Sequence, residues 1–298
     1  MVVFPLRIPL FPLSYMTAIS NQSEIGLPTF SIDPPNSWTA IGFRELWDYR
    51  ELLYFLIWRD VKVRYKQTAL GAAWAVIQPV FMMLVFSLFF GRLGKIPSDG
   101  IPYPVFTFCA LLPWQLFAHA VAESSNSLVS NQNLITKVYF PRLVVPISAV
   151  LGGLVDFAIA FVLLVVMMRY YGIVPSWAII TLPAFLLLAI MTALGVGLWL
   201  SALNVQYRDV RYTINFLIQF WLFATPVAYP SSLVPERWRA LYGLNPMAGV
   251  VEGFRWALLG KTDPPGAMLW VSVAVVILLL VGGLYYFRRM EQQFADVV

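Results

Sequence analysis

The sequence predicts an all-α polytopic membrane protein with six transmembrane helices. Of its 298 residues, 60% are hydrophobic and 12% are charged, and the mean hydropathy is +0.74. About a quarter of the residues in soluble domains are charged, so this chain is too apolar to be one. Its apolar residues form runs long enough to cross roughly 30 Å of hydrocarbon, and basic residues lie at the ends of those runs. We therefore interpret the net charge of +5 as an orientation signal and not as a nucleic-acid surface.

The first expected element is a flexible cytoplasmic tail, residues 1–43, because prolines interrupt its short apolar pieces. An N-terminal amphipathic interfacial helix should follow over about residues 45–66 and lie in the headgroup layer. At helical spacing its charged residues form one stripe, which consists of Asp48, Glu51, Arg59, Lys62 and Lys66. The basic residues at its end directly precede an apolar run and should stay in the cytoplasm. One alternative is that they act only as a positive-inside signal.

The predicted membrane domain covers residues 44–289, and a cytoplasmic tail, residues 290–298, follows it. The six expected spans are residues 69–91, 103–121, 143–168, 177–203, 213–228 and 267–287. An even number of spans places both termini in the cytoplasm. Lys and Arg are more frequent on that side, as the positive-inside rule requires.

Two connections are predicted to contain short helices. Residues 123–142 are too polar to cross the membrane and longer than a minimal connection, so we expect a cytoplasmic element with a short helix and a docking surface. Residues 229–266 are rich in proline, and their apolar pieces are too short to span. They should form short re-entrant helices in the outer half of the bilayer, before the last span.

Two groups of phenylalanines and one acid are candidate functional residues within the spans. The phenylalanines are Phe86, Phe89 and Phe90 in the first span and Phe216, Phe220 and Phe223 in the fifth. Such rings can stack on the C–H faces of sugars, although rings in a membrane protein also face lipid or other helices. Asp156 is an ionisable group within the third span and therefore a functional candidate, although a lone carboxylate can equally be hydrogen-bonded structure.

Residues suited to enzymatic chemistry are sparse. One histidine, His119, and one cysteine, Cys109, provide no metal-binding motif, so no metal site is expected. The sequence from Gly260 to Thr262 resembles the end of a phosphate-binding loop, but Arg255 stands where that loop requires a glycine. An integral membrane glycosyltransferase, the alternative from a different class, would need a catalytic pair of carboxylates, and the pattern offers none.

Several stretches, in the same order, resemble one known family, the membrane subunits of type-2 ABC exporters that move lipid-linked polysaccharides such as O-antigen, capsule and teichoic acid. They are RDVKVRYKQTALGAAWAVIQP (59–79), SNQNLITKVYFPR (130–142), LNVQYRDVRY with the later ATPVAYP (203–230), and GLNPMAGVVEGFRWALLG (243–260). The resemblance implies a transport subunit, not an enzyme, for ATP-driven export of an O-antigen-like polysaccharide across the bacterial cytoplasmic membrane. Within the same architecture the alternatives are export of teichoic acid, lipid or small molecules.

The resemblance also implies partners and residue roles. The chain would form a homodimer with two copies of a separate ABC ATPase that binds ATP and Mg²⁺, so no cofactor is expected in this chain. The element that docks on the ATPase would comprise Asn131, Leu134, Ile135, Thr136, Lys137, Val138, Tyr139 and Arg142. Residues expected to gate the path and recruit the lipid pyrophosphate are Arg59, Lys62, Arg64 and Lys66. The first and fifth spans would line the path, with their phenylalanines along it.

Overall fold

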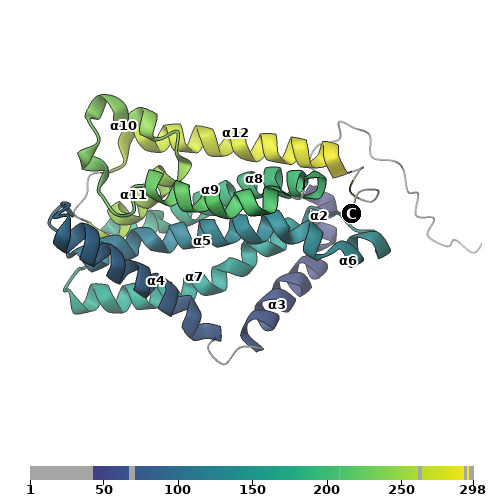
Figure 1. The fold of residues 1–298 in the computed structure, drawn as a ribbon, viewed down its shortest axis with the longest axis horizontal. Helices are drawn as coiled ribbons and strands as arrows, with labels where there is room; N and C mark the ends of the chain where they lie inside the picture. Colours follow the sequence, from purple (N-terminus) through teal and green to yellow (C-terminus); the bar gives the residue numbers. More distant parts are fainter. Residues whose placement is uncertain (1–42, 67–70, 208, 261–263, 292–293, 295–298) are drawn as a thin grey trace, which may run out of the picture. The chain divides into compact units, whose positions relative to one another are not determined.

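A computed structural model describes residues 43–66, 71–207, 209–260, 264–291 and 294, and every regular element in these ranges is a helix (Figure 1). The α-helices are α2 (Phe43–Asp48), α3 (Arg50–Lys66), α4 (Gly71–Phe86), α5 (Tyr103–Ser130), α6 (Gln132–Lys137), α7 (Val144–Tyr170), α8 (Leu182–Gln206), α9 (Val210–Ala224), α10 (Glu236–Tyr242), α11 (Pro246–Leu259) and α12 (Gly266–Glu291). A π-helix, η1 (Ser87–Leu93), continues α4, and 3₁₀ turns form η2 (Trp177–Thr181) and η3 (Ser231–Leu233). The predicted N-terminal tail lies outside the described residues, apart from Phe43.

Five helical segments in the described ranges are long and apolar enough to cross a membrane. They are Ala73–Leu93, Tyr103–Ser130, Val144–Tyr170, Trp177–Gln206 and Gly266–Glu291. Five of the six predicted spans therefore coincide with such a segment. The chain is a multi-pass, all-helical membrane protein over these ranges.

The fifth predicted span, residues 213–228, is shorter than expected. Helix α9 has 15 residues, and at 1.5 Å per residue it is about 22 Å long, less than the roughly 30 Å of a hydrocarbon core. The helix ends at Ala224 because Pro226 follows Thr225, and a residue before proline disfavours helical dihedral angles. Thr225 accordingly has extended dihedral angles. The prediction of six full-length transmembrane helices is thus only partly confirmed.

Helix α5 is the centre of the packing, since it lies against both α7 and α8, and α8 in turn packs along α12 (Figure 1). Close approach of α8 and α12 depends on two glycines. A Cβ atom on Gly195 would lie 2.9 Å from the backbone nitrogen of Leu280, and one on Gly283 would lie 2.6 Å from the carbonyl oxygen of Gly195. Small residues at such crossings let helix backbones approach closely in a membrane.

Helix α5 is longer than the second predicted span, residues 103–121, because it continues to Ser130. Polar residues suggested that the chain leaves the membrane near residue 122, yet Ser124 and Ser125 are fully buried. The hydroxyl of Ser125 donates to the carbonyl of Ala122 (2.8 Å), so the serine stays satisfied inside the helix packing. Gly197 of α8 leaves the space that Ser124 fills, since a Cβ there would lie 2.5 Å from its Oγ. These small polar residues are thus buried against α8 within the continuous helix.

The short helices predicted between residues 229 and 266 are present as α10 and α11. The side-chain oxygen of Asn245 accepts a hydrogen bond from the backbone nitrogen of Met247 and caps α11. Helix α11 is buried over nearly its whole length and packs against α5, α8 and α12. It is therefore part of the core of this region and not a surface element.

Candidate functional site

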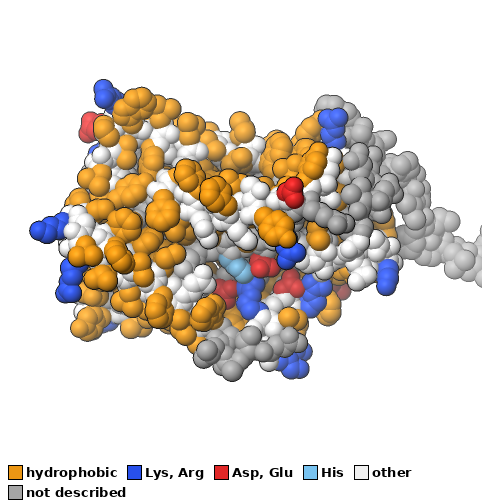
Figure 2. All heavy atoms as spheres, in the orientation of Figure 1, with side chains coloured by type: hydrophobic (Ala, Val, Ile, Leu, Met, Phe, Trp, Pro, Cys, Tyr) orange, Lys and Arg blue, Asp and Glu red, His pale blue; other side chains and the backbone are white. Residues whose placement is uncertain are grey.

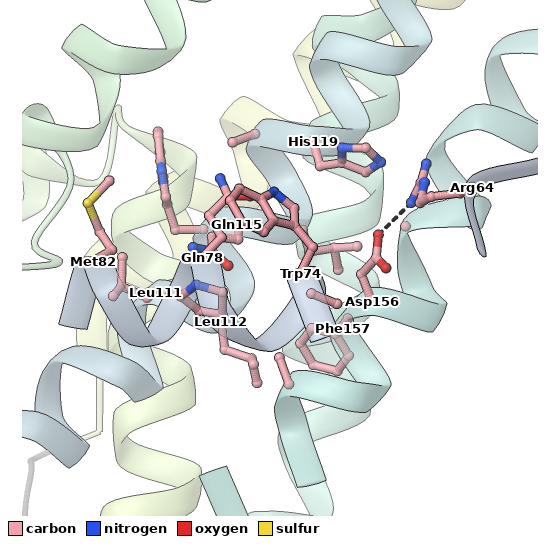
Figure 3. A pocket seen from close by; sticks show the side chains of 17 residues that line it. Arg64, Trp74, Gln78, Met82, Leu111, Leu112, Gln115, His119, Asp156 and Phe157 are labelled. Carbon is pink, nitrogen blue, oxygen red and sulfur yellow. Dashed lines mark hydrogen bonds and ion pairs between the residues drawn. The ribbon is translucent and has the colours of Figure 1, made fainter. Parts of the chain in front are cut away.

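Helices α4, α5 and α7 line a cavity of about 560 Å³, which has Arg64 of α3 at one end (Figure 3). Each of α4 and α5 contributes residues four positions apart, which lie on one helix face. Helix α4 contributes Trp74, Gln78 and Met82, and α5 contributes Leu111, Gln115 and His119. Because α4 and α5 run in opposite directions here, His119 lies near the Arg64 end and Leu111 near Met82 (Figure 3). The cavity thus grades from polar to apolar.

The polar end is organised by Asp156 of α7. Arg64 forms an ion pair with its Oδ2 atom, and the Tyr65 hydroxyl donates a hydrogen bond to its Oδ1 atom. Burial, followed by the hydrogen bond to Asp156, raises the pKa of Tyr65, so the phenol keeps its proton at neutral pH and donates. Asp156 is therefore a paired acid that fastens the end of α3 to α7. Figure 2 shows acidic and basic side chains gathered around the histidine within a largely hydrophobic face.

The four basic residues predicted to act together are divided by the structure. Arg59 forms an ion pair with Asp60 (2.8 Å) and donates to the side-chain oxygen of Asn131 (2.9 Å). Arg64 pairs with Asp156, whereas Lys62 and Lys66 are exposed. The contact between Arg59 and Asn131 joins α3 to the beginning of α6. Sequence spacing alone could not reveal these pairings, because the partners are 72 and 92 residues away.

The predicted docking element is present as α6 and the segment after it, but its residues have two different environments. Ile135 is buried in an apolar cluster with Leu56 and Phe140. The exposed residues are Thr136, Lys137, Val138 and Tyr139, and Leu134 is partly buried. Only the exposed side chains are available to a partner in this conformation.

Arg142, the last residue of the predicted docking element, binds the C-terminal segment. Its guanidinium donates to the carbonyl oxygen of Glu291, and its backbone nitrogen donates to Glu291 Oε1 (3.2 Å). Phe294 is buried in the same apolar cluster as Ile135 and packs edge-on against Phe287, with ring centroids 5.2 Å apart. Glu291 and Phe294, predicted as part of a cytoplasmic tail, thus support the α6 region.

The two phenylalanine groups also differ in exposure. Phe216, Phe220 and Phe223 are all exposed on α9, with 68%, 67% and 60% of their surface accessible. In the first group only Phe89 is exposed. Phe86 is buried and packs edge-on against Phe90, with ring centroids 5.3 Å apart. Phe86 therefore serves the packing of this chain.

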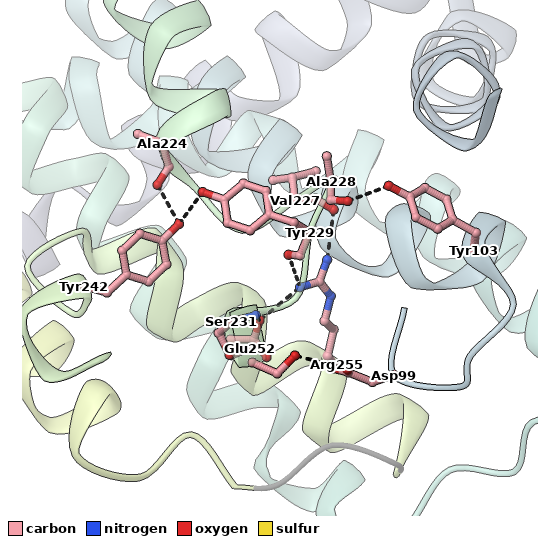
Figure 4. Close-up of polar contacts among 11 residues, drawn as sticks. Asp99, Tyr103, Ala224, Val227, Ala228, Tyr229, Ser231, Tyr242, Glu252 and Arg255 are labelled. Carbon is pink, nitrogen blue, oxygen red and sulfur yellow. Dashed lines mark hydrogen bonds and ion pairs between the residues drawn. The ribbon is translucent and has the colours of Figure 1, made fainter. Parts of the chain in front are cut away.

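A buried ion pair lies within helix α11 (Figure 4). Arg255 is fully buried, forms an ion pair with Glu252 (3.0 Å), and stacks on Phe106 with its guanidinium carbon 3.6 Å from the ring centroid. It also donates to the carbonyl oxygens of Val227 (2.9 Å) and Tyr229 (3.3 Å). The pair therefore holds the segment that follows α9.

Sequence reasoning missed both the cavity and this buried pair. Arg255 entered only as a residue that breaks a phosphate-loop pattern, although an acid and a base three residues apart in an apolar helix were a usable signal. Gly260 has a φ of +64° and ends α11, as glycine commonly does at helix C-termini. Lys261 and Thr262 lie outside the described residues. Within the described ranges, His, Cys, Asp and Glu side chains form no group of three that could hold a metal ion.

Comparison with known proteins yields consistent matches over most of the chain. The profile of the ABC-2 type transporter family matches residues 51–259. The chain is 33% identical to the O-antigen export system permease protein RfbA of Myxococcus xanthus over 258 residues, which cover 86% of this chain and 98% of that protein. It is 24% identical to the polysialic acid transport protein KpsM of Escherichia coli, over 80% and 92% of the two chains. It is 26% identical to the inner membrane transport permease YadH of Escherichia coli K12, over 69% and 82%.

Proposed function

Because this chain belongs to the ABC-2 type transporter family, as a permease subunit and not an enzyme, we propose that it forms the membrane path of an exporter for a lipid-linked, O-antigen-like polysaccharide. The observation that carries this proposal is the similarity to an O-antigen export permease over 86% of the chain. Two further relatives are likewise named for O-antigen and polysialic acid. The family also implies a partner ATPase.

In the proposed assembly, two copies of the chain pair with two copies of the ATPase, which bind ATP and Mg²⁺. The exposed side chains from Thr136 to Tyr139 form the docking surface, because they combine apolar and basic groups at the end of α6 and in the segment directly after it. Movement of α6 would reach α3 through the Arg59–Asn131 hydrogen bond. Helix α3 would in turn transmit the movement to the cavity through the Arg64–Asp156 ion pair.

The proposed topology places the complex in the bacterial cytoplasmic membrane with both termini inside. The name of the YadH relative, an inner membrane permease, supports this location. Helix α9 would complete a sixth crossing together with residues 225–231, where Arg255 donates to the carbonyl oxygen of Val227 and Glu252 accepts from the backbone nitrogen of Ser231. Non-helical backbone at membrane depth is tolerated where protein groups satisfy it in this way.

The exposed face of α9 forms the proposed sliding surface for the glycan. Its three phenylalanines are spaced i, i+4 and i+7 and point away from the packed face that contains Ile214 and Leu222. Weak stacking on several rings lets a long chain bind without being trapped. Phe89 of η1 is the only member of the other group that is exposed in the same way, among the described residues. Lys62 and Lys66 are the proposed contacts for the lipid pyrophosphate.

Purification with the co-expressed ATPase, followed by mass spectrometry of bound lipid, tests the proposal. We expect a polyprenyl-type lipid that carries sugar, and loss of surface polysaccharide in cells that lack the chain. A complex with an ATPase unable to hydrolyse ATP is the control, and it should retain the lipid but not export it. Bound teichoic acid, a simple lipid or a small molecule, together with normal surface polysaccharide, would overturn the assignment and favour one of the other substrate classes.

A further inference from the structure

The polar end of the cavity suits an uncharged ligand rich in hydroxyl groups. Arg64 and Asp156 neutralise each other there, so a phosphate could bind Arg64 only by separating the pair. The buried Nε2 atom of His119 has no hydrogen-bond partner among the described residues. Gln78 and Gln115 line the next level of the cavity, and each amide offers donors and an acceptor. These groups match alcohols better than anions.

Trp74 adds a flat aromatic surface to this set. Figure 3 shows it between the Arg64–Asp156 pair and the two glutamines. A sugar ring presents C–H faces to an aromatic ring and hydroxyls around its edge, so one ring can use Trp74 and the surrounding polar groups at once. The cavity volume of about 560 Å³ falls within the range of small-molecule sites.

We propose that this cavity binds a single sugar ring of the lipid-linked substrate, the ring next to its phosphate, while the phosphate stays outside the cavity. This inference rests on the proposed export function and places the first sugar of the exported lipid in the cavity between α4, α5 and α7. Lys62 and Lys66 lie about one helical turn apart on α3, but each is two residues from Arg64 and so about 160° around the helix from the side chain that borders the cavity. The place of the sugar ring therefore rests on the cavity residues and not on these lysines.

The apolar end of the cavity limits the ligand to one ring. Beyond the two glutamines the walls are apolar, with Met82, Leu111 and Ala160 among the lining residues. Hydroxyls of a second ring would find no hydrogen-bonding side chain there, and burying them unpaired is unfavourable. The site is therefore specific for the sugar nearest the lipid and insensitive to the rest of the polymer.

The test uses the complete complex with its ATPase in nanodiscs, without nucleotide, and two probes. One probe is a polyprenyl diphosphate that carries one hexose, and the other is the same lipid diphosphate without the hexose. Native mass spectrometry measures both dissociation constants. We expect the wild-type complex to bind the sugar-bearing probe about tenfold more tightly, which corresponds to one or two net hydrogen bonds and a stacking contact.

The variants separate binding of the sugar in the cavity from binding of the lipid diphosphate at the lysines. Gln115→Met and Trp74→Leu should abolish the preference for the sugar and leave binding of the sugarless lipid unchanged, whereas Lys62→Gln with Lys66→Gln should weaken both probes equally. Gln206→Met, at an exposed position at the end of α8, is the matched control and should behave as wild type. Equal binding of both probes by the wild type, or a preference that survives both cavity variants, overturns the inference while leaving the export proposal intact. Failure of both probes to bind above background would count against the export proposal itself.

Discussion

Removal of one partner from the Glu252–Arg255 pair is the perturbation for which the structure gives the clearest magnitude. Glu252→Gln keeps the shape of the side chain but leaves the fully buried guanidinium without its counter-charge. Breaking a buried pair in this way costs about 3–5 kcal/mol. The interaction of Arg255 with Phe106, about 2 kcal/mol when desolvated, and its two carbonyl partners remain. We therefore expect the lower part of that range, about 3 kcal/mol.

Arg255→Met tests the other half of the reasoning. It leaves Glu252 buried without its ion-pair partner and also removes donors from the carbonyls of Val227 and Tyr229, each worth about 1–3 kcal/mol when left unsatisfied. The double variant Glu252→Leu, Arg255→Met should recover part of the loss but not all of it, because the carbonyls remain unpaired. Thermal unfolding of the purified chain in nanodiscs, monitored by the fraction that stays free of aggregates, should give decreasing stability in the order wild type, double variant, single variants. Single variants within about 1 kcal/mol of wild type would refute this account of the pair.

Three further predictions concern the proposed transport function. Lys62→Gln with Lys66→Gln should reduce polymer export severalfold at unchanged membrane insertion, because both lysines are exposed, and normal export would reduce them to topology signals. Tyr139→Asp should abolish co-purification with the ATPase while the chain unfolds at its normal temperature, since Tyr139 is 74% exposed; retained co-purification would remove it from the docking surface. Phe220→Ala with Phe223→Ala should stall polymer export per folded complex while ATP hydrolysis continues. A normal polymer length and a normal export rate in this variant would contradict the sliding-surface proposal.

The sequence was informative wherever a single helix determined the outcome. Apolar runs located five membrane-length segments, and prolines marked the short helices before the last one. The sequence-based predictions failed where contacts with a residue on another helix determined whether a side chain is buried. Ser124 fell in the polar connection predicted over residues 123–142, but Gly197 on another helix provides the space that buries it. Likewise, Ile135 carries the same apolar character as the exposed Val138, and only the tertiary packing distinguishes core from surface.

The candidate site shows the same division. Leu111, Gln115 and His119 follow one another at intervals of four residues, but such spacing on one helix does not define a cavity until α4 and α7 supply the other walls. Asp156 was predicted as an intramembrane acid and Arg64 as a phosphate-binding base. Because the two form an ion pair, neither charge remains available for the predicted role. Such pairings depend on helix packing and not on local sequence.

The support that Glu291 and Phe294 give to the α6 region has a consequence for biosynthesis. Phe294 follows the last long helix, α12, yet it lies in the apolar cluster that contains Ile135. Since a chain emerges from the ribosome with its N-terminus first, this cluster cannot be completed until the segment after α12 has been made. A nascent chain, or one that stops before Phe294, can insert its helices before the α6 region has this support. On the proposed docking, recruitment of the ATPase would then require the segment after α12, and an affinity tag is better placed away from Phe294.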